Sequence, residues 1–265
     1  MEPLGANSTA IKKWLNVDGK GVEIGAFKTP LPHISPYYVD CFDEYAGAAC
    51  LLDFKSDACH LPFKSYTLDY VASSHVIEHI ANPLQALGEW SRVLLPEGRI
   101  YMVIPDKTKT WDRPRVTTTA AHLIEDFGGR VDQTDGQHVA DFVDGMVWSE
   151  FAPGKSGEER QQFRQALQAS SEAGLEINIH FHTFEPASFP KVIEEINAAR
   201  VLPRPLRILD LIENFPADNP NGFLVVLEAE PTLPQQLAAT FHRTMRWWSQ
   251  DWPVRSGTVR LSRKI

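Results

Sequence analysis

The sequence predicts an α/β fold of the Rossmann-like, doubly wound kind, with a mostly parallel sheet. In the first half of the chain, short apolar runs alternate with helical stretches, which is the pattern of parallel strands wrapped by helices. The first apolar run ends in a glycine turn at Gly25, where a ligand can approach bare backbone. Two late apolar runs, 206–215 and 222–230, are separated only by a turn and can pair antiparallel. They predict a reversed edge strand on an otherwise parallel sheet.

The individual elements follow from periodicity and from breaking residues. A first helix is predicted because Ile77, Ile80, Leu84 and Leu87 recur at helical spacing, before a proline and glycine turn that ends it. The expected helices lie at 76–94 and 184–200. The expected strands lie at 21–25, 37–40, 68–74, 99–106, 206–215 and 222–230.

A change of pattern divides the chain. Between residues 107 and 178 the stretches become polar and helical, which predicts an inserted helical cap. The expected domain organisation is a ligand-binding half of the core at 1–106, the cap at 107–178, the end of the core at 179–230, and a C-terminal helix and tail at 231–265.

The net charge and the placement of basic residues indicate which classes of partner the protein binds. Lys and Arg number 26 against 34 Asp and Glu, so the net charge of −8 repels a phosphate backbone and predicts that the protein does not act on nucleic acid. Basic residues interleaved with tryptophans gather after residue 242. We interpret this tail as a surface for a partner or for a homodimer, or as a local nucleic-acid patch.

The cysteines and the absence of long apolar runs predict a compartment. The three cysteines are odd in number and form no C-x-x-C pair, which fits reduced thiols and gives no metal-ligand spacing. The N-terminal segment lacks a basic stretch followed by an apolar run, and no run approaches the roughly 20 apolar residues that cross a bilayer. A cytoplasmic protein without a membrane span is expected.

Carboxylates stand at the ends of the first two predicted strands and before a later turn. Glu23 precedes the turn at Gly25, Asp40 ends the second strand, and Asp57 precedes a proline turn. Because the carboxyl ends of parallel strands meet at one edge of the sheet, we expect the three carboxylates to converge on one rim, where Asp40 is placed to accept hydrogen bonds from a ribose diol. The loop after Gly25 lacks the G-x-G-x-x-G pattern, which disfavours a hydride-transfer enzyme.

Several short motifs between residues 21 and 106 together resemble the core of class I S-adenosylmethionine (SAM)-dependent methyltransferases of the type 11 group. They are Asp57-Ala58, Leu61-Pro62-Phe63, Asp69-Tyr70-Val71, Ser73-Ser74-His75-Val76-Ile77-Glu78-His79-Ile80, Asn82-Pro83, Arg92-Val93-Leu94 and Pro96-Glu97-Gly98. A second likeness includes Ile179-His180-Phe181-His182-Thr183-Phe184, which is similar to predicted methyltransferases of bacterial surface-polysaccharide clusters.

The resemblance implies SAM as cofactor and a place for its methionine portion. In such enzymes this portion lies over the first turn, here Glu23, Gly25 and Ala26. Phe27 and Thr29 stand where the family has a glycine-rich loop, so this part of the pocket departs from the family pattern.

The nucleoside portion of SAM follows in the same way. The resemblance implies that Asp40 binds the ribose and that Asp57 faces the adenine amino group, with Ala58 contributing backbone. Ser74 and His75, after the fourth strand of the family's core, line the floor near the sulfonium. We therefore expect residues 1–106 to form the SAM-binding half of the Rossmann-like core.

The segment from His75 to His79 has two interpretations. It matches H-x-x-E-H, a zinc-peptidase signature in which two histidines at helical spacing bind metal and the glutamate activates water. Within a methyltransferase, Glu78 or His79 instead binds a metal, acts as a base, or only packs and caps a helix. No metal ligand is predicted, and His75 and His79 are kept as catalytic candidates.

His180 and His182 are the other candidate bases. They alternate on an extended segment and are expected to point the same way, before a helix whose N-terminus faces the ligand edge. A hydroxyl acceptor loses its proton as it takes the methyl group, and a histidine titrating near neutral pH suits that task. A purely structural role is the alternative. His122 on the cap is a weaker candidate.

The predicted function is in-line methyl transfer from SAM to a hydroxyl of a sugar or another polar small molecule, with alignment and desolvation of the reactants supplying most of the acceleration. The cap's polar and aromatic residues, Trp111, Asp112, Arg113 and Arg115 among them, favour a glycan acceptor. The alternatives are a SAM-binding scaffold without catalysis and the zinc peptidase.

Overall fold

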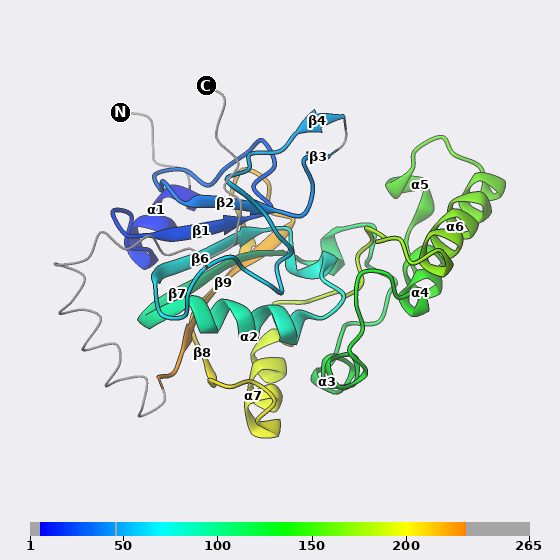
Figure 1. Cartoon of the computed structure of the whole chain (residues 1–265). Coiled ribbons are helices and arrows are strands. Elements are labelled where there is room, and N and C mark those ends of the chain that lie inside the picture. The colour runs from blue at the N-terminus through cyan, green and yellow to red at the C-terminus, as the bar shows by residue number, and fades with distance from the viewer. Residues whose placement is uncertain (1–5, 46, 232–265) are drawn as a thin grey trace.

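The structure is a computed structural model that describes residues 6–45 and 47–231. Its strands are β1 (Gly21–Ile24), β2 (Tyr37–Asp40), β3 (Glu44–Tyr45), β4 (Ala48–Ala49), β5 (Phe54–Lys55), β6 (Leu68–Ser74), β7 (Leu94–Pro105), β8 (Leu206–Phe215) and β9 (Gly222–Ala229). In the described residues, all but β3 and β4 join one sheet in the order β5-β2-β1-β6-β7-β9-β8 (Figure 1). Strands β3 and β4 pair with each other.

The direction of the strands confirms the predicted fold class. From β5 to β7 every pairing is parallel, while β9 is antiparallel to both of its neighbours, β7 and β8. The reversed strand is therefore one position in from the edge, and β8 is the edge strand. Burial explains this order: every residue of β9 is buried, as a central strand requires, whereas β8 carries charged and partly exposed residues.

Helices cover both faces of the sheet. The α-helices are α1 (Ala6–Trp14), α2 (Pro83–Val93), α3 (Ala120–Gly129), α4 (Gln137–Gly145), α5 (Trp148–Phe151), α6 (Gly157–Glu172) and α7 (Phe189–Ala199), and the short 3-10 turns are η1 (Ile77–His79) and η2 (Lys107–Lys109). Helices α2 and α7 lie on one face of the sheet and α1 lies on the other (Figure 1). Alternation along β7 divides the core in the same way: Ile100 and Met102 pack with α2 and α7, whereas Tyr101 and Val103 pack with α1.

The helix predicted at 76–94 is wrong in its first part. Residues 77–79 form the 3-10 turn η1, and α2 begins only at Pro83. Proline has no N–H to donate and disfavours helical backbone in the residue before it, so it suits the first turn of a new helix. The side chain of Asn82 caps that helix by accepting from the N–H of Gln85 at 3.1 Å. His79 therefore lies on a separate turn and not on α2.

Two other boundaries differ from those predicted. Strand β7 begins at Leu94 instead of 99, because the expected break stays extended and is absorbed by an irregular register and a left-handed backbone at Glu97. Helix α7 begins at Phe189 instead of 184. Phe184 instead forms a parallel bridge with Asp106, which brings the 177–184 segment to the end of β7.

The predicted cap region contains α3 to α6, to the side of the sheet (Figure 1). Helices α4 to α6 share an apolar cluster with Ile177, Ile179 and Phe181, whereas α3 packs on the main core through Ala120 and Leu123. The boundaries of the predicted domains stay a prediction. The C-terminal helix and tail, with the homodimer expected through them, fall beyond residue 231 and so outside the described residues. None of the helices in 6–45 and 47–231 has the length and apolar character of a bilayer span.

Candidate active site

A cavity of about 1090 Å³ opens at the carboxyl ends of β1, β2 and β6. On the sheet side it is lined by all the residues that the sequence proposed for cofactor binding: Glu23, Gly25, Ala26, Asp40, Asp57, Ala58, Ser74 and His75. The three carboxylates predicted to converge on one rim thus share one cavity.

Glu23 is nearly fully buried at the end of β1. Its carboxylate accepts the N–H of Leu31, at 2.9 Å from Oε1 and 3.2 Å from Oε2. Burial raises the pKa of Glu23 to about 7, against the opposing effect of the Leu31 hydrogen bond. Glu23 therefore both faces the cavity and holds the loop that follows β1.

The turn at Gly25 needs a glycine for two reasons. Its φ is +68°, in the left-handed region that other residues avoid. A Cβ at this position would lie 2.6 Å from Cγ2 of Val76. The loop therefore passes closely over the start of the η1 segment, and the backbone stays open to a ligand from the cavity.

Asp40 and Asp57 each accept a hydrogen bond from nearby backbone. Asp40 Oδ1 accepts the N–H of Phe42 at 3.0 Å, and burial raises the pKa of Asp40 above its ordinary value. Asp57 Oδ1 accepts the N–H of Cys59 at 2.6 Å, and Oδ2 lies 2.9 Å from Nδ1 of His60. These local contacts orient both carboxylates at the cavity wall.

His75 lies directly after β6 with a φ of +54°, an uncommon conformation for a residue other than glycine. Its partly exposed ring lines the cavity, and its Nδ1 is 3.7 Å from Oε1 of Glu78. Burial, and the proximity of His180, lower the pKa of His75. The ring is therefore neutral near pH 7 and able to accept a proton.

His79 lines the cavity as the last residue of η1. Its Nδ1 lies 2.7 Å from Oδ1 of Asn178, and because an amide oxygen only accepts, this contact assigns the proton to Nδ1 and leaves Nε2 with a lone pair. Burial lowers the pKa of His79 to about 3. Its ring meets that of His180 edge to face, with centroids 4.5 Å apart.

A pair of buried acidic groups lies behind these histidines. Asp112 Oδ2 is 2.6 Å from Nδ1 of His180, and Oδ1 accepts from Arg115 at 2.9 Å. Glu78 is fully buried, neither of its carboxylate oxygens has a hydrogen-bond partner in the described part of the chain, and burial raises its pKa to about 8. At neutral pH Glu78 is therefore largely protonated.

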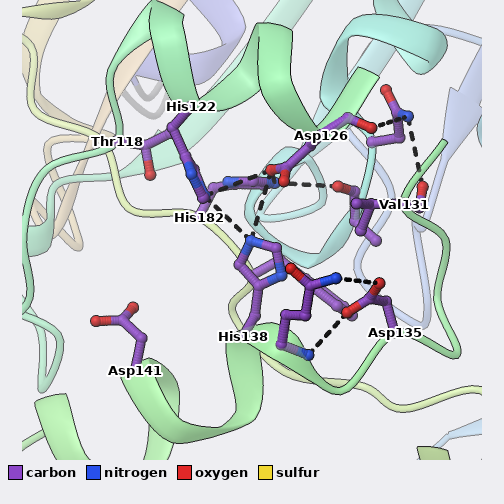
Figure 2. A network of polar contacts seen from close by, with 12 residues as sticks. Thr118, His122, Asp126, Val131, Asp135, His138, Asp141 and His182 are labelled. Atoms are coloured by element: carbon purple, nitrogen blue, oxygen red, sulfur yellow. Dashed lines mark hydrogen bonds and ion pairs between the residues drawn. The ribbon is translucent and has the colours of Figure 1, made fainter. Parts of the chain in front are cut away.

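The structure places the other two candidate bases outside the cavity lining. His180 packs between His79 and Trp111, whereas His182 lies with His122, His138 and Asp126 (Figure 2). The expectation that both rings face one ligand edge is not met, because the 177–184 segment is not a regular strand over these residues. Of the four candidate bases, His75 and His79 reach the cavity.

The zinc-peptidase interpretation is wrong in its geometry. It requires two histidines one turn apart on an α-helix, but His75 directly follows β6 in left-handed backbone and residues 77–79 form a 3-10 turn. In this region, the residues close enough to share one metal ion are Glu78, His79 and His180. His75 is not among them.

A second part of the cavity wall was missed by the sequence interpretation. It consists of polar residues from the loop after α3 and from the segment before His180: Arg130, Asp132, Gln133, Thr134, Glu176 and Asn178. Gln133 joins this wall to the η1 segment, donating from Nε2 to the carbonyl of His79 at 3.0 Å and accepting the N–H of Ala81 at 2.6 Å. Nothing in the local sequence around Gln133 indicated these contacts.

Comparison with known proteins supports the class of enzyme. Residues 32–102 match the profile of the type 11 methyltransferase family, described as a methyltransferase domain. No curated protein sequence matches the chain. The predicted class, a SAM-dependent methyltransferase, is confirmed by the family match, and so is SAM as its cofactor.

Solved structures with a similar fold include SAM-dependent methyltransferases. One from Methanosarcina mazei has 13% identity and a TM-score of 0.45, covering 83% of this chain and 97% of that one. One from Thermotoga maritima has 16% identity and a TM-score of 0.42, covering 85% and 88%. One from Aquifex aeolicus has 11% identity and a TM-score of 0.41, covering 85% and 90%. At these low scores, the assignment depends on the family profile.

Proposed function

We propose that the protein O-methylates a sugar or another polar small molecule. The observation that carries this proposal is the pairing of two unlike walls around one cavity. One wall follows the strand ends and carries Glu23, Asp40 and Asp57, and the other carries amide, hydroxyl and charged side chains from residues 130–134 and 176–178. At about 1090 Å³ the cavity slightly exceeds the usual range of small-molecule pockets, which leaves room for cofactor and acceptor together.

The strand-end wall fits SAM. Asp40 offers carboxylate oxygens to a ribose diol, Asp57 offers them to an amino group, and the bare backbone at Gly25 allows close approach of the methionine portion. Ala58 is held in place because its carbonyl accepts the indole N–H of Trp90 at 2.9 Å. When bound, SAM supplies an electrophilic methyl group on a sulfonium, whose carbon–sulfur electron pair stays with sulfur as the acceptor oxygen bonds to the methyl carbon.

His75 is our first choice for the general base. Its ring faces the cavity and is neutral near pH 7, so its free nitrogen can take the proton that the acceptor hydroxyl loses. His79 is the second choice, with Nε2 available and Nδ1 held by Asn178. We assign His180, held by Asp112, to positioning the ring of His79.

The acceptor wall favours a polyhydroxylated molecule over a nucleic acid. Side chains such as Gln133, Thr134 and Asn178 donate and accept hydrogen bonds, as sugar hydroxyls require. The net charge of −8 opposes a polyanion at long range. A surface-polysaccharide precursor is therefore the acceptor class that we would test first.

The test has two stages with separate readouts. Calorimetry would measure SAM binding, which we expect for the wild-type protein and, at reduced affinity, for His75→Gln, since the ring also lines the floor near the sulfonium. Transfer of a labelled methyl group to a panel of mono- and oligosaccharides, with RNA and peptides as other arms, would then identify the acceptor. We expect a sugar to be labelled and His75→Gln to lose most of that rate, while His33→Gln, a control outside the cavity, keeps it. SAM binding with labelling of RNA or peptide alone would overturn the sugar proposal.

A further inference from the structure

Three histidines and an aspartate meet in a second cluster, outside the cavity lining (Figure 2). His122 and Asp126 lie on α3 one turn apart and so share a face of the helix, His138 comes from α4, and His182 comes from the segment before α7. One ligand-type atom of each residue lies within 4.8 Å of the corresponding atoms of the others. None of the four residues is among those that line the methyl-transfer cavity.

The spacing of these atoms matches a tetrahedral metal centre. Nε2 of His122 is 3.1 Å from Nε2 of His138, and Oδ2 of Asp126 lies 3.4, 3.5 and 3.7 Å from Nε2 of His122, His138 and His182. Zinc bonds to imidazole nitrogen and carboxylate oxygen are about 2.0–2.2 Å long, and a tetrahedron with such bonds has edges of about 3.3–3.6 Å. The observed separations cluster around these edges.

The cluster is costly without a cation. Asp126, His138 and His182 are buried, with exposed fractions of 5%, 6% and 0%. In the described ranges, Oδ2 of Asp126 has no hydrogen-bond donor although imidazole nitrogens surround it. A buried carboxylate oxygen left without a partner costs free energy. In a contact between two Nε2 atoms, one nitrogen donates its proton to the other, so neither His122 nor His138 has an Nε2 proton left for Asp126. A cation at the centre would give the facing nitrogen or oxygen atom of each of the four residues a partner at once.

We propose that His122, Asp126, His138 and His182 bind one divalent transition-metal ion, with zinc as the preferred metal. Imidazole and carboxylate ligands in a closed four-coordinate arrangement are typical of zinc. His182 Nε2 also lies 3.2 Å from the carbonyl of Ala81. When the metal binds, His182 carries its proton on Nδ1, so that the Nε2 lone pair faces the ion.

The position of the cluster gives the metal a structural role. It joins α3, α4 and the 177–184 segment, and the loop between α3 and α4 supplies the cavity residues 130–134. The ion would fix three elements that are far apart in the sequence and so hold the acceptor wall in place. The proposal does not depend on the acceptor or on SAM, because its ligands lie outside that cavity.

The first test is metal content. The full-length protein, purified without added metal or chelator, would be measured by elemental analysis, and we expect about one zinc per chain in the wild type and in the controls His33→Gln and Asp43→Asn. Asp126→Asn and His138→Gln should retain little zinc, with affinity lost by more than the about 10–100-fold typical of removing an outer hydrogen-bond partner of a ligand. Zinc retained equally by Asp126→Asn and by wild type would overturn the proposal.

The second test avoids buried substitutions. Chelated wild-type protein titrated with Co²⁺ should develop the intense visible absorption of a tetrahedral site and saturate at one equivalent, and zinc should abolish that absorption and raise Tm. His122 is the most exposed of the four, so His122→Gln should fold normally yet weaken Co²⁺ binding. A weak octahedral spectrum would overturn the closed four-coordinate site, and a spectrum unchanged in folded His122→Gln would show that these side chains are not the ligands.

Discussion

The carboxylate of Glu23 accepts the backbone N–H of Leu31 at 2.9 Å, which ties the end of β1 to the far end of the loop that passes over the cavity. The same buried carboxylate therefore contributes to the stability of the fold and fixes the loop that lines the cavity. Because Glu23 is almost fully buried, its protonation also makes stability depend on pH.

We predict that Glu23→Gln changes the pH dependence of stability. The folded-state pKa of Glu23 is raised from 4.5 to about 7, so its contribution to stability is fully present below about pH 4.5 and is lost as pH rises through about 7. The loss amounts to about 3 kcal/mol in the free energy of unfolding. Glutamine does not titrate, so relative to wild type the variant should gain stability by that amount between pH 4.5 and 8. Urea unfolding at a series of pH values tests this, and parallel curves for the two proteins would contradict it.

Gly25→Ala should abolish SAM binding and destabilise the protein by about 1–3 kcal/mol, since the new methyl group collides with Val76 and the φ of +68° is unfavourable. Gly154→Ala is the matched control, because Gly154 also has a positive φ but a Cβ there meets nothing within 4 Å. The control should lose only the smaller part of the stability, which comes from the unfavourable φ, and it should bind SAM as the wild type does. Equal effects of both changes would mean that the approach to Val76 is unimportant.

Asp40→Asn should weaken SAM binding by about 10- to 150-fold, the range expected on losing a hydrogen bond to a charged group of about 1.5–3 kcal/mol. Asp43→Asn provides the comparison, because Asp43 is an exposed acid nearby that pairs with Lys55 and does not line the cavity. Calorimetric Kd values for the two variants should differ by at least tenfold. Similar values would remove Asp40 from the ribose site.

The rate of methyl transfer should fall at low pH with a limb below pH 6.5. Burial lowers the pKa of both His75 and His79, and a general base must be neutral to accept a proton. Activity is therefore retained above the lowered pKa and lost as pH drops through it. The profile of kcat/KM for wild type and for His75→Gln and His79→Gln assigns the limb, which should vanish in the variant that lacks the base. A limb that survives in both would point to another group.

Much of the sheet and of its ligand edge follows from local sequence. Apolar runs located β1, β2, β6, β8 and β9, and the residues at their ends could be placed on one rim because parallel strands finish at the same edge. The sheet order, with β9 between β7 and the edge strand β8, could not be predicted from the hairpin pattern alone. It depends on the difference in burial between the two strands. The start of α2 was missed because apolar spacing outweighed the signal from Pro83.

Contacts between distant segments were harder to predict. His122 and Asp126 are one helical turn apart and recognisable as a pair, but His138 and His182 join them only through tertiary packing. The directions of His180 and His182 were missed for a related reason. The 177–184 segment is held by long-range bonds, such as that from the N–H of Thr118 to the carbonyl of Thr183 at 2.9 Å, and these override simple alternation.

Gln133→Leu should separate the acceptor wall from the η1 segment without changing the size of the side chain much. The substitution leaves the N–H of Ala81 and the carbonyl of His79 without their partner, and each unpaired buried group costs about 1–3 kcal/mol. Since the contact lies on the acceptor side of the cavity, we expect KM for the acceptor to rise while the Kd of SAM stays within about twofold of wild type. Gln137→Leu is the control, because Gln137 bonds only within the exposed turn at Asp135. Loss of SAM affinity equal to the loss of acceptor affinity would show that Gln133 supports the whole cavity and not one wall.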